Sequence, residues 1–254
     1  MKHLKIFLSI SEFEAAKPSM DTPFVVLEKG TPKVIFSNLP QISEDDLTDG
    51  DYVDLGLPSG LKWATCNLGA EKPCDFGDYF MWGSTTPNTN DVCSWANAPF
   101  NNGSTSCDKT YFNAHWSEWL DGGVLKLKLE YDAVAAATNG AAHMPTKADW
   151  EELKANTTNE WVTCVTALGH KGHTAVNGRL FTSKTDSSKK IFIPASGYRL
   201  GSSFGTQGSG ASLWSSSLNT SETKYSWGFS FYDSSFSVYS DNRYTGLCVR
   251  GVKD

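Results

Sequence analysis

The sequence is short of basic residues and of long apolar runs. Its 254 residues carry 22 Lys and Arg against 28 Asp and Glu, for a formal net charge of −6. Because nucleic-acid-binding proteins neutralise phosphates with basic patches, this balance excludes nucleic acid as an expected partner. No run approaches the ~20 apolar residues of a spanning helix, so we expect no membrane span. The first residues combine a short apolar run with no small-residue cleavage site, so they make no convincing signal peptide and we expect synthesis in the cytoplasm.

Motifs for catalysis and for cofactors are also missing. The chain has no phosphate-binding loop, dinucleotide fingerprint or nucleophile elbow, so we expect no cofactor. Its cysteines include no Cys-x-x-Cys pair and none has a histidine at a zinc-ligand offset. An even number of cysteines permits three disulfides, but their irregular spacing favours mostly reduced, buried thiols. The six are Cys66, Cys74, Cys93, Cys107, Cys164 and Cys248.

Two polar loops are weak candidates for metal ligands. The oxygen-rich loop 88–91 has no second carboxylate cluster nearby, which leaves a structural calcium open but gives no lectin-type calcium site. His170 and His173 form the only close histidine pair, in a Gly-flanked loop more typical of solvated side chains. We therefore predict no metal site.

The chain is rich in apolar residues (39 %) and aromatics (13 %), enough to build a core without disulfides. Residues 1–48 form a small β-rich appendage and linker. Within it we predict a strand over 4–8, a helical turn over 11–17 and a hairpin of strands 24–28 and 33–36, followed by a linker over 43–50. A hairpin this small is marginal alone, so we expect it to pack on the main domain or on a neighbouring subunit.

Residues 49–254 have the pattern of one irregular α+β domain, with short strands, two helices and long loops. The first helix is predicted over 131–138. The second begins after the cap Thr146 and runs to Lys154, with Trp150 and Leu153 on one face. Short strands are predicted over 52–55, 62–65, 78–82, 191–194 and 247–250.

Six segments carry a resemblance to a known family. They are residues 52–70, 77–83, 144–147, 194–199, 213–217 and 246–252, in this order along the chain. Together they resemble the Fibrobacter succinogenes major paralogous domain, which is common in gut Bacteroidetes and their phages. The resemblance implies a C-type-lectin-like fold, with scaffold residues Trp63, Trp82, Trp214 and Arg250. It also implies a likeness to the variable proteins of diversity-generating retroelements, in which adenine positions near the end of the gene are randomised.

The composition between Gly201 and Gly246 agrees with a display surface. This stretch is crowded with Ser, Tyr, Phe, Asn, Asp and Gly, a composition that resembles that of an antibody's binding loops. Changes at the adenines of Asn and Asp codons also lead to these residue types. The alternative is that this stretch is an ordinary Ser-rich sheet that faces solvent.

If Phe229 and Phe231 point inward, Ser230 and Tyr232 point outward. The candidate ligand-binding residues are Ser202, Ser203, Phe204, Thr206, Asn219, Tyr225, Ser230, Tyr232, Ser235, Phe236, Ser237, Tyr239, Asp241, Asn242, Arg243 and Tyr244.

These patterns predict a non-catalytic receptor-binding or adhesin protein on a phage virion or cell surface, whose partner is a protein or glycan of a cell surface. The first alternative is a structural virion or surface-assembly protein that docks or self-assembles through residues 1–48. The second is an enzyme of the formylglycine-generating type with Cys248 as its thiol. No second cysteine lies within a few positions of Cys248, and its place on an inward strand position favours an inert, buried thiol.

Overall fold

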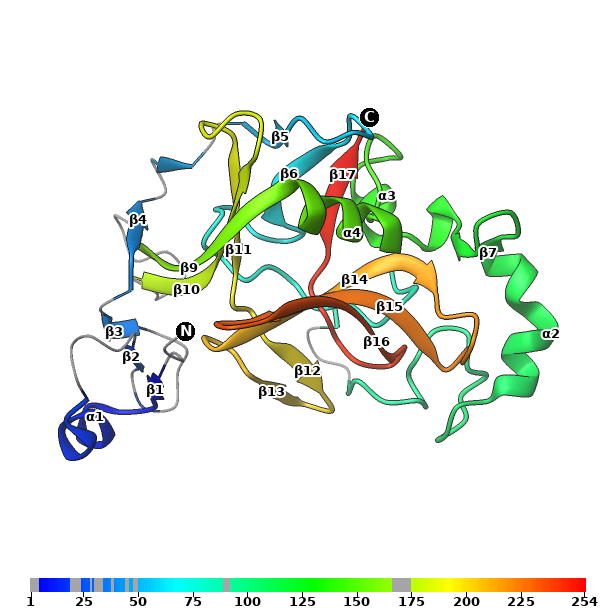
Figure 1. The fold of residues 1–254 in the computed structure, drawn as a ribbon. Helices are drawn as coiled ribbons and strands as arrows, with labels where there is room; N and C mark the ends of the chain where they lie inside the picture. Colours follow the sequence, from blue (N-terminus) through cyan, green and yellow to red (C-terminus); the bar gives the residue numbers. More distant parts are fainter. Residues whose placement is uncertain are drawn as a thin grey trace.

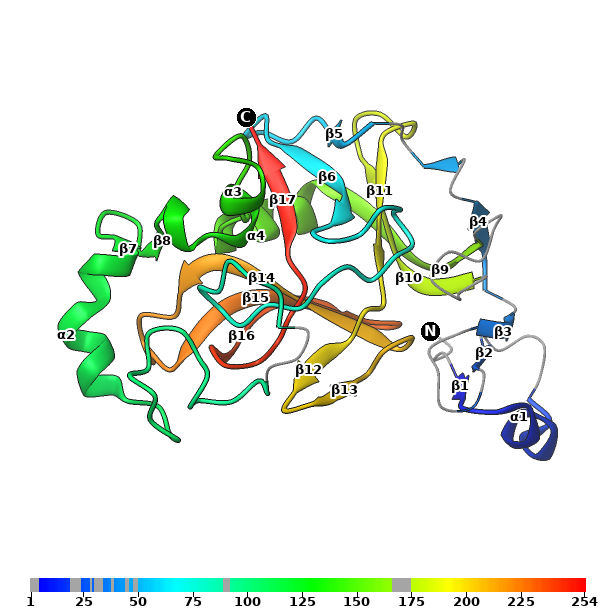
Figure 2. The same ribbon diagram turned by 180° about the vertical axis from the view of Figure 1, so that it is seen from behind.

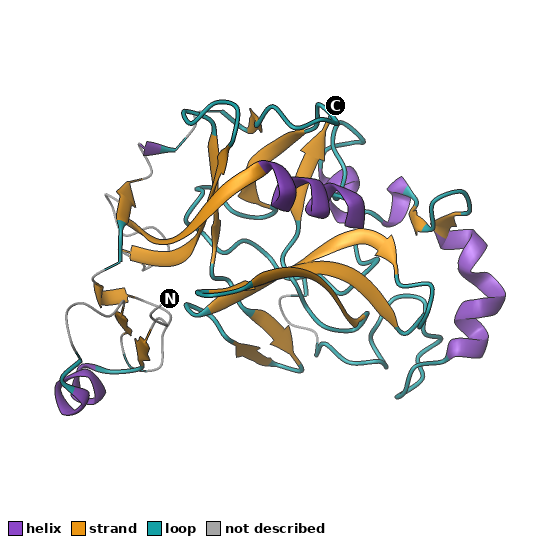
Figure 3. Cartoon of the chain, in the orientation of Figure 1, coloured by secondary structure: helices purple, strands orange, loops and turns teal. Residues whose placement is uncertain are grey.

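The computed structural model describes residues 5–18, 24–27, 29, 34–37, 39–43, 46–47, 50–88, 92–165 and 175–254. These residues form a mixed α+β structure, as expected, and four α-helices accompany its several irregular sheets (Figure 3). Strands make up most of the regular structure. In the described part of the chain, no helix has the length and apolarity needed to cross a membrane.

The N-terminal segment forms a three-stranded sheet with one helix, at the edge of the molecule (Figure 1). The predicted hairpin is present, and the predicted first strand pairs with it in parallel. Val25 and Leu27 belong to the main hydrophobic core, so the segment packs on the main domain. The elements are β1 (Lys5–Phe7), α1 (Ile10–Ala16, capped by Ser9), β2 (Phe24–Leu27) and β3 (Val34–Ser37).

The chain enters the main body earlier than the predicted linker suggests. Strand β4 pairs in parallel with β9, which makes it the outer strand of a four-stranded sheet in the order β11-β10-β9-β4. Part of the predicted appendage is therefore a strand of the main sheet. The bounds are β4 (Gln41–Ser43), β9 (Thr157–Val165), β10 (Ala175–Ser183) and β11 (Lys190–Pro194).

A second sheet joins the end of the chain to its middle. Its order is β17-β6-β5, with β5 (Tyr52–Asp54), β6 (Lys62–Asn67) and β17 (Arg250–Lys253). The buried guanidinium of Arg250 donates to Asn67 Oδ1 at 2.9 Å and to the carbonyl oxygens of Ala64, Thr65 and Phe192. Arg250 thus ties β17, β6 and β11 together. The four expected scaffold residues, Trp63, Trp82, Trp214 and Arg250, are all completely buried.

A third sheet, in the order β16-β15-β14-β8-β7, has α4 on one side and the β12–β13 hairpin on the other (Figures 1 and 2). The Trp150 ring of α4 stacks on Phe229, with centroids 4.7 Å apart and planes 2° apart. The bounds are β7 (Leu120–Asp121), β8 (Lys126–Leu127), β12 (Tyr198–Leu200), β13 (Ser203–Gly205), β14 (Gly210–Leu218), β15 (Tyr225–Tyr232) and β16 (Phe236–Asn242).

Both helices predicted in the main domain are present. The first is a 3₁₀ turn (Leu129–Tyr131) followed by α3 (Ala133–Ala137), whose cap Asp132 accepts from the Val134 and Ala135 amides. The second is α4 (Lys147–Asn156), which begins with the predicted capping box of Thr146 and Asp149.

Three expectations about elements were wrong. Helix α2 (Lys109–Trp119) was missed, because it buries only Phe112 and Trp119 and so has almost no apolar periodicity. The predicted strand 78–82 forms only an isolated bridge from Phe80 to Leu247. Of the predicted strand 247–250, only Arg250 belongs to a strand, the first residue of β17. Leu247 and Cys248 make isolated bridges instead.

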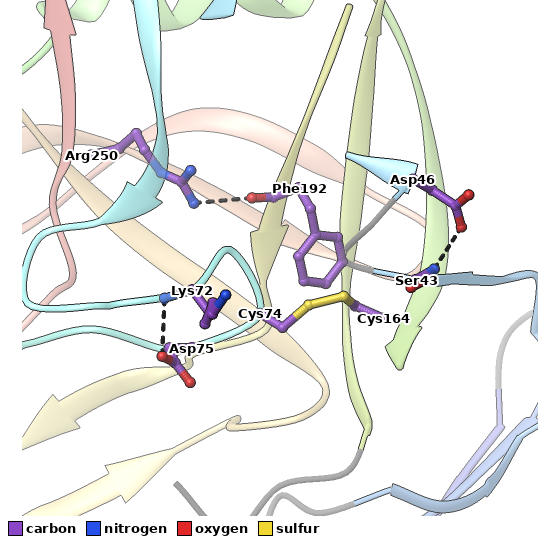
Figure 4. The surroundings of a disulfide bond; sticks show 8 residues. All are labelled: Ser43, Asp46, Lys72, Cys74, Asp75, Cys164, Phe192 and Arg250. Carbon is purple, nitrogen blue, oxygen red and sulfur yellow. Dashed lines mark hydrogen bonds between the residues drawn. A yellow bond between two sulfur atoms is a disulfide. The ribbon is translucent and has the colours of Figure 1, made fainter. Parts of the chain in front are cut away.

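One pair of cysteines departs from the expectation of reduced thiols. Cys74 and Cys164 form a disulfide, buried beside Phe192, that joins the loop after β6 to β9 (Figure 4). They are 90 residues apart, so only the fold brings them together. The other four cysteines form no disulfide, and of these Cys93 and Cys248 are buried as expected.

We expect the Cys74–Cys164 disulfide to contribute about 2–4 kcal/mol to the free energy of unfolding, because it closes a long loop in the unfolded chain. Urea denaturation of the Cys74→Ala/Cys164→Ala double variant measures this loss. A reductant is the matched control: it lowers the midpoint of the wild type and leaves that of the double variant, which has no disulfide to lose, nearly unchanged. Equal midpoints for the double variant and the wild type would show that the cross-link does not stabilise the fold.

Candidate ligand-binding surface

The sheet of β14, β15 and β16 has one face committed to the core. Phe229 and Phe231 of β15 point inward and are completely buried. Their register partners on β14, Leu213 and Ala211, lie in the same core. Side chains alternate along a strand, so the even-numbered residues of β15, among them Ser230 and Tyr232, turn to the opposite face. The prediction that Phe229 and Phe231 point inward is confirmed.

The opposite face carries a row of hydroxyl groups between tyrosines. Ser212, Ser230 and Ser237 are register partners across the three strands, and the Ser212 and Ser230 hydroxyl oxygens lie 3.3 Å apart. Tyr232 is 41 % exposed, Ser237 is exposed, Ser230 and Tyr239 are half-buried, and Ser212 is buried. We call these five residues, Ser212, Ser230, Tyr232, Ser237 and Tyr239, the open face.

The Tyr239 hydroxyl is held by its neighbours. It donates to Asp241 Oδ2 at 3.3 Å and is hydrogen-bonded to the Ser212 hydroxyl. Burial, and then the Asp241 charge, raise the pKa of Tyr239 well above its ordinary value. This hydroxyl therefore stays protonated and neutral.

Asp241 lies at the end of the open face and is engaged within the protein. Its Oδ1 accepts from the Asn242 amide at 2.7 Å and from the Thr245 hydroxyl at 3.3 Å. Burial raises the pKa of this carboxyl, although its hydrogen bonds act in the opposite direction. Asp241 consequently orients Tyr239 and the following turn.

Two of the candidate residues are buried in the scaffold. The guanidinium of Arg243 is completely buried, lies 4.0 Å over the Phe112 ring and donates from Nε to the Thr223 carbonyl at 2.9 Å. Asn219 is 8 % exposed, and its side chain accepts from the Ser221 amide in a turn. The expectation that Arg243 and Asn219 face a ligand is corrected, because their side chains already satisfy neighbouring backbone groups.

Strand alternation places three further candidates on the inner face of the sheet. Phe236 is the register partner of Phe231, and its ring packs at 6.0 Å from Phe229 and 4.9 Å from the Arg179 guanidinium. Tyr225 and Asn242 are partners at the far end of the strands, on the same side as Phe236. These three residues therefore lie away from the open face.

The remaining candidates lie outside the open face. Ser202, Ser203 and Phe204 are exposed on the β12–β13 hairpin, and Ser235 is exposed in the turn between β15 and β16. Thr206 is half-buried at φ 56°, and its carbonyl accepts from the Ser209 and Gly210 amides. Tyr244 is half-buried, with its ring 5.0 Å from Trp95.

The sequence reasoning missed two residues of this region, Ser212 and Tyr198. Strand alternation is the signal that identifies Ser212, because its neighbours Ala211 and Leu213 point into the core. Tyr198 lies beside Ser212, since Gly197 is bridged to Ala211. Only the pairing of these distant segments places Tyr198 here, and no local pattern predicts it.

Arg179 fixes the tip of the β15–β16 hairpin to the neighbouring sheet. Its Nη2 donates to the carbonyl oxygens of Tyr232 at 2.5 Å and Asp233 at 2.9 Å, and Nη1 donates to Asn159 Oδ1. Burial lowers the pKa of Arg179 to about 10, so the group stays charged at neutral pH. The backbone below Tyr232 is thus anchored from the side opposite the open face.

Metal and thiol chemistry find little support among the described residues. Within the described ranges, no three His, Cys, Asp or Glu side chains gather as metal ligands. Asn88 uses its side-chain oxygen to accept from the Met81 amide at 2.6 Å, while residues 89–91, His170 and His173 lie outside the described residues. Cys248 is completely buried, and burial raises its pKa to about 12, so its thiol is not a ready nucleophile.

Comparisons of the chain with protein-family models, curated proteins and solved structures find no match.

The raised pKa of Asp241 predicts how stability changes with pH. The folded state holds this proton more tightly than the unfolded chain, so the carboxyl favours folding most below its ordinary value of 3.8. This contribution is lost as the pH rises through the folded-state value. We expect the unfolding free energy of the wild type, relative to Asp241→Asn, to fall as the pH rises from below 3.8 toward neutrality. Urea titrations across this range measure it, and a constant or rising difference would contradict the assignment.

Proposed function

We propose that this protein is a non-catalytic binding protein with a C-type-lectin-like scaffold, which displays a ligand-contact surface on the open face of β14–β16. One observation carries the proposal. A single segment divides by strand parity into aromatic residues that build the core and into Ser and Tyr residues that turn outward. Substitution of the exposed residues of the outer face, Tyr232 and Ser237, removes no side chain of the buried core.

The chemistry of the open face suits recognition of a macromolecule. Tyrosine provides a rigid amphipathic contact with little rotamer entropy to lose, and serine provides adaptable hydrogen bonds. Tyr232 offers an exposed ring beside the hydroxyl groups of Ser230 and Ser237. The partner we propose is a protein or glycan on a cell surface.

The resemblance to retroelement variable proteins gives the open face a further role. Ser and Tyr are both reached from an Asn codon through changes at adenines, so Ser230, Tyr232, Ser237 and Tyr239 are of types that such a process leaves. The proposed scaffold residues Trp214 and Arg250 are instead completely buried and fixed by packing. We therefore propose that the open face is diversified between copies of the gene.

The Cys74–Cys164 disulfide supports a site of action outside a reducing compartment, because such bonds persist mainly in oxidising environments. A virion or a cell surface is such an environment. We propose this localisation for the folded protein, after synthesis in the cytoplasm.

A second candidate function is virion or surface assembly through the N-terminal segment. Leu8 and Ile10 are 58 % and 49 % exposed at the start of α1, while Val25 and Leu27 of the same segment are buried in the main core. Apolar side chains at that position suit a docking contact. The gene neighbourhood separates the two functions: a reverse transcriptase beside a near-identical template repeat favours display, whereas tail genes alone favour assembly.

The diversification proposal predicts a pattern of natural variation. Deep sequencing of codons 199–246 in many copies from one source population should find substitutions at adenine positions, concentrated at residues 230, 232, 237 and 239. Phe229, Phe231 and Trp214 should be spared because they form the core. Codons 52–99 of the same reads are the control. Equal variation in both regions would overturn diversification.

A further inference from the structure

Three tyrosines of this region each face a glycine directly across two paired strands. The register pairs Tyr198 with Gly205, Tyr232 with Gly210 and Tyr239 with Gly228. An aromatic ring opposite a glycine can lie down on the bare backbone of the neighbouring strand, because no Cβ stands in its way.

The distance from a Cβ atom placed on each glycine to its nearest neighbours shows how closely the tyrosine ring approaches the backbone. A Cβ on Gly205 would lie 2.5 Å from Cζ and 2.7 Å from the hydroxyl oxygen of Tyr198, and its three nearest neighbours all belong to that side chain. A Cβ on Gly210 would lie 2.7 Å from Tyr232 Cδ1 and 2.8 Å from the Phe231 carbonyl oxygen. The Tyr198 and Tyr232 rings therefore rest against glycine backbone.

Gly228 differs from Gly205. A Cβ there would first meet the Leu213 carbonyl oxygen, at 2.6 Å, and the Tyr239 ring only at 3.3 Å. Backbone packing alone thus requires glycine at this position. The Gly228 pair is a natural control for the Gly205 pair, where the three nearest atoms all belong to the tyrosine side chain.

The Tyr198 and Tyr232 pairs are joined through a third glycine. The Gly197 amide donates to the Gly210 carbonyl oxygen at 2.8 Å, and a Cβ on Gly197 would collide with the Gly205 carbonyl oxygen. Gly197 also has φ 69°, in the left-handed region that favours glycine. The two rings therefore lie on one continuous patch of glycine backbone beside the open face.

We propose that Gly205 and Gly210 are positioning residues that lay the rings of Tyr198 and Tyr232 flat at the border of the open face, so that each ring turns one face outward. The backbone covers one side of the ring and restricts its motion, which lowers the entropy lost when a ligand packs on the other side. The statement that a ligand packs on these rings rests on the proposed function. The placement of the rings stands independently of it.

Glycine at these positions also suits a surface that is diversified at neighbouring codons. A template codon for glycine begins with two guanines, so an adenine-directed process keeps Gly205 and Gly210 where the template encodes glycine, while it replaces Tyr232. Each new side chain at residue 232 then meets the same bare backbone.

A double-mutant cycle tests the contact without any ligand. Gly205→Ala, Tyr198→Ser and the combined variant are compared by urea denaturation. We expect Gly205→Ala to lower the midpoint in the presence of Tyr198, and most of that loss to disappear in the Tyr198→Ser background, because the clash is with the ring. For the matched cycle of Gly228→Ala and Tyr239→Ser we expect near-additive losses, because the Leu213 carbonyl remains.

A second measurement uses the wild-type protein and does not depend on whether a variant folds. Rings lying over Gly205 and Gly210 shift the Hα resonances of these glycines upfield in proton NMR and give contacts between ring and Hα protons. Additive losses in the Gly205 cycle, or unshifted Hα resonances, would overturn the positioning role. Neither result bears on diversification, which the sequencing of codons 199–246 decides separately.

Discussion

The contact between Trp150 and Phe229 determines which side of the third sheet becomes a surface. Trp150 projects from α4 and stacks flat on Phe229, and both side chains are completely buried. Once Phe229 points toward α4, strand alternation sends Ser230 and Tyr232 to the other side. A one-residue slip in the register of β15 would exchange the two faces and remove the core, so the packing of this helix specifies the open face.

Buried arginines make the surrounding scaffold independent of the open face. Arg179, Arg243 and Arg250 donate chiefly to backbone carbonyl oxygens. Every residue type carries such a carbonyl, so these hydrogen bonds do not depend on which side chain follows it. Burial lowers the pKa of each to about 10, which still leaves them charged at neutral pH. Removing one would leave several carbonyl groups buried without a donor. The scaffold therefore depends little on the identity of the outward residues.

Local patterns in the sequence predicted the elements whose causes are local. The capping box at Thr146 set the start of α4, and alternation around Phe229 gave the inward and outward residues of β15. Cys248 was placed on an inward strand position and is buried.

Features that depend on distant pairing were not predicted from the sequence. Phe236 resembled an outward aromatic, but its side is set by its register with Phe231. Arg243 resembled a surface charge, yet the loop that receives its guanidinium includes Pro99, far away in the chain. The Cys74–Cys164 pairing and the position of Tyr198 beside Ser212 have the same origin. In each case the partner is supplied by another part of the fold, which no local pattern encodes.

The central claim is that the outer face of β15 and β16 can change while the inner face cannot. Saturation mutagenesis of residues 226–242, with each variant scored for resistance to proteolysis, tests it most directly. The account predicts alternation along β15, with Ser230 and Tyr232 accepting most residue types and Phe229 and Phe231 accepting few. On β16, Ser237 should tolerate replacement more than Phe236. Tolerance that is uniform along both strands, or greatest at Phe229 and Phe231, would contradict the division of this sheet into a fixed face and a variable face.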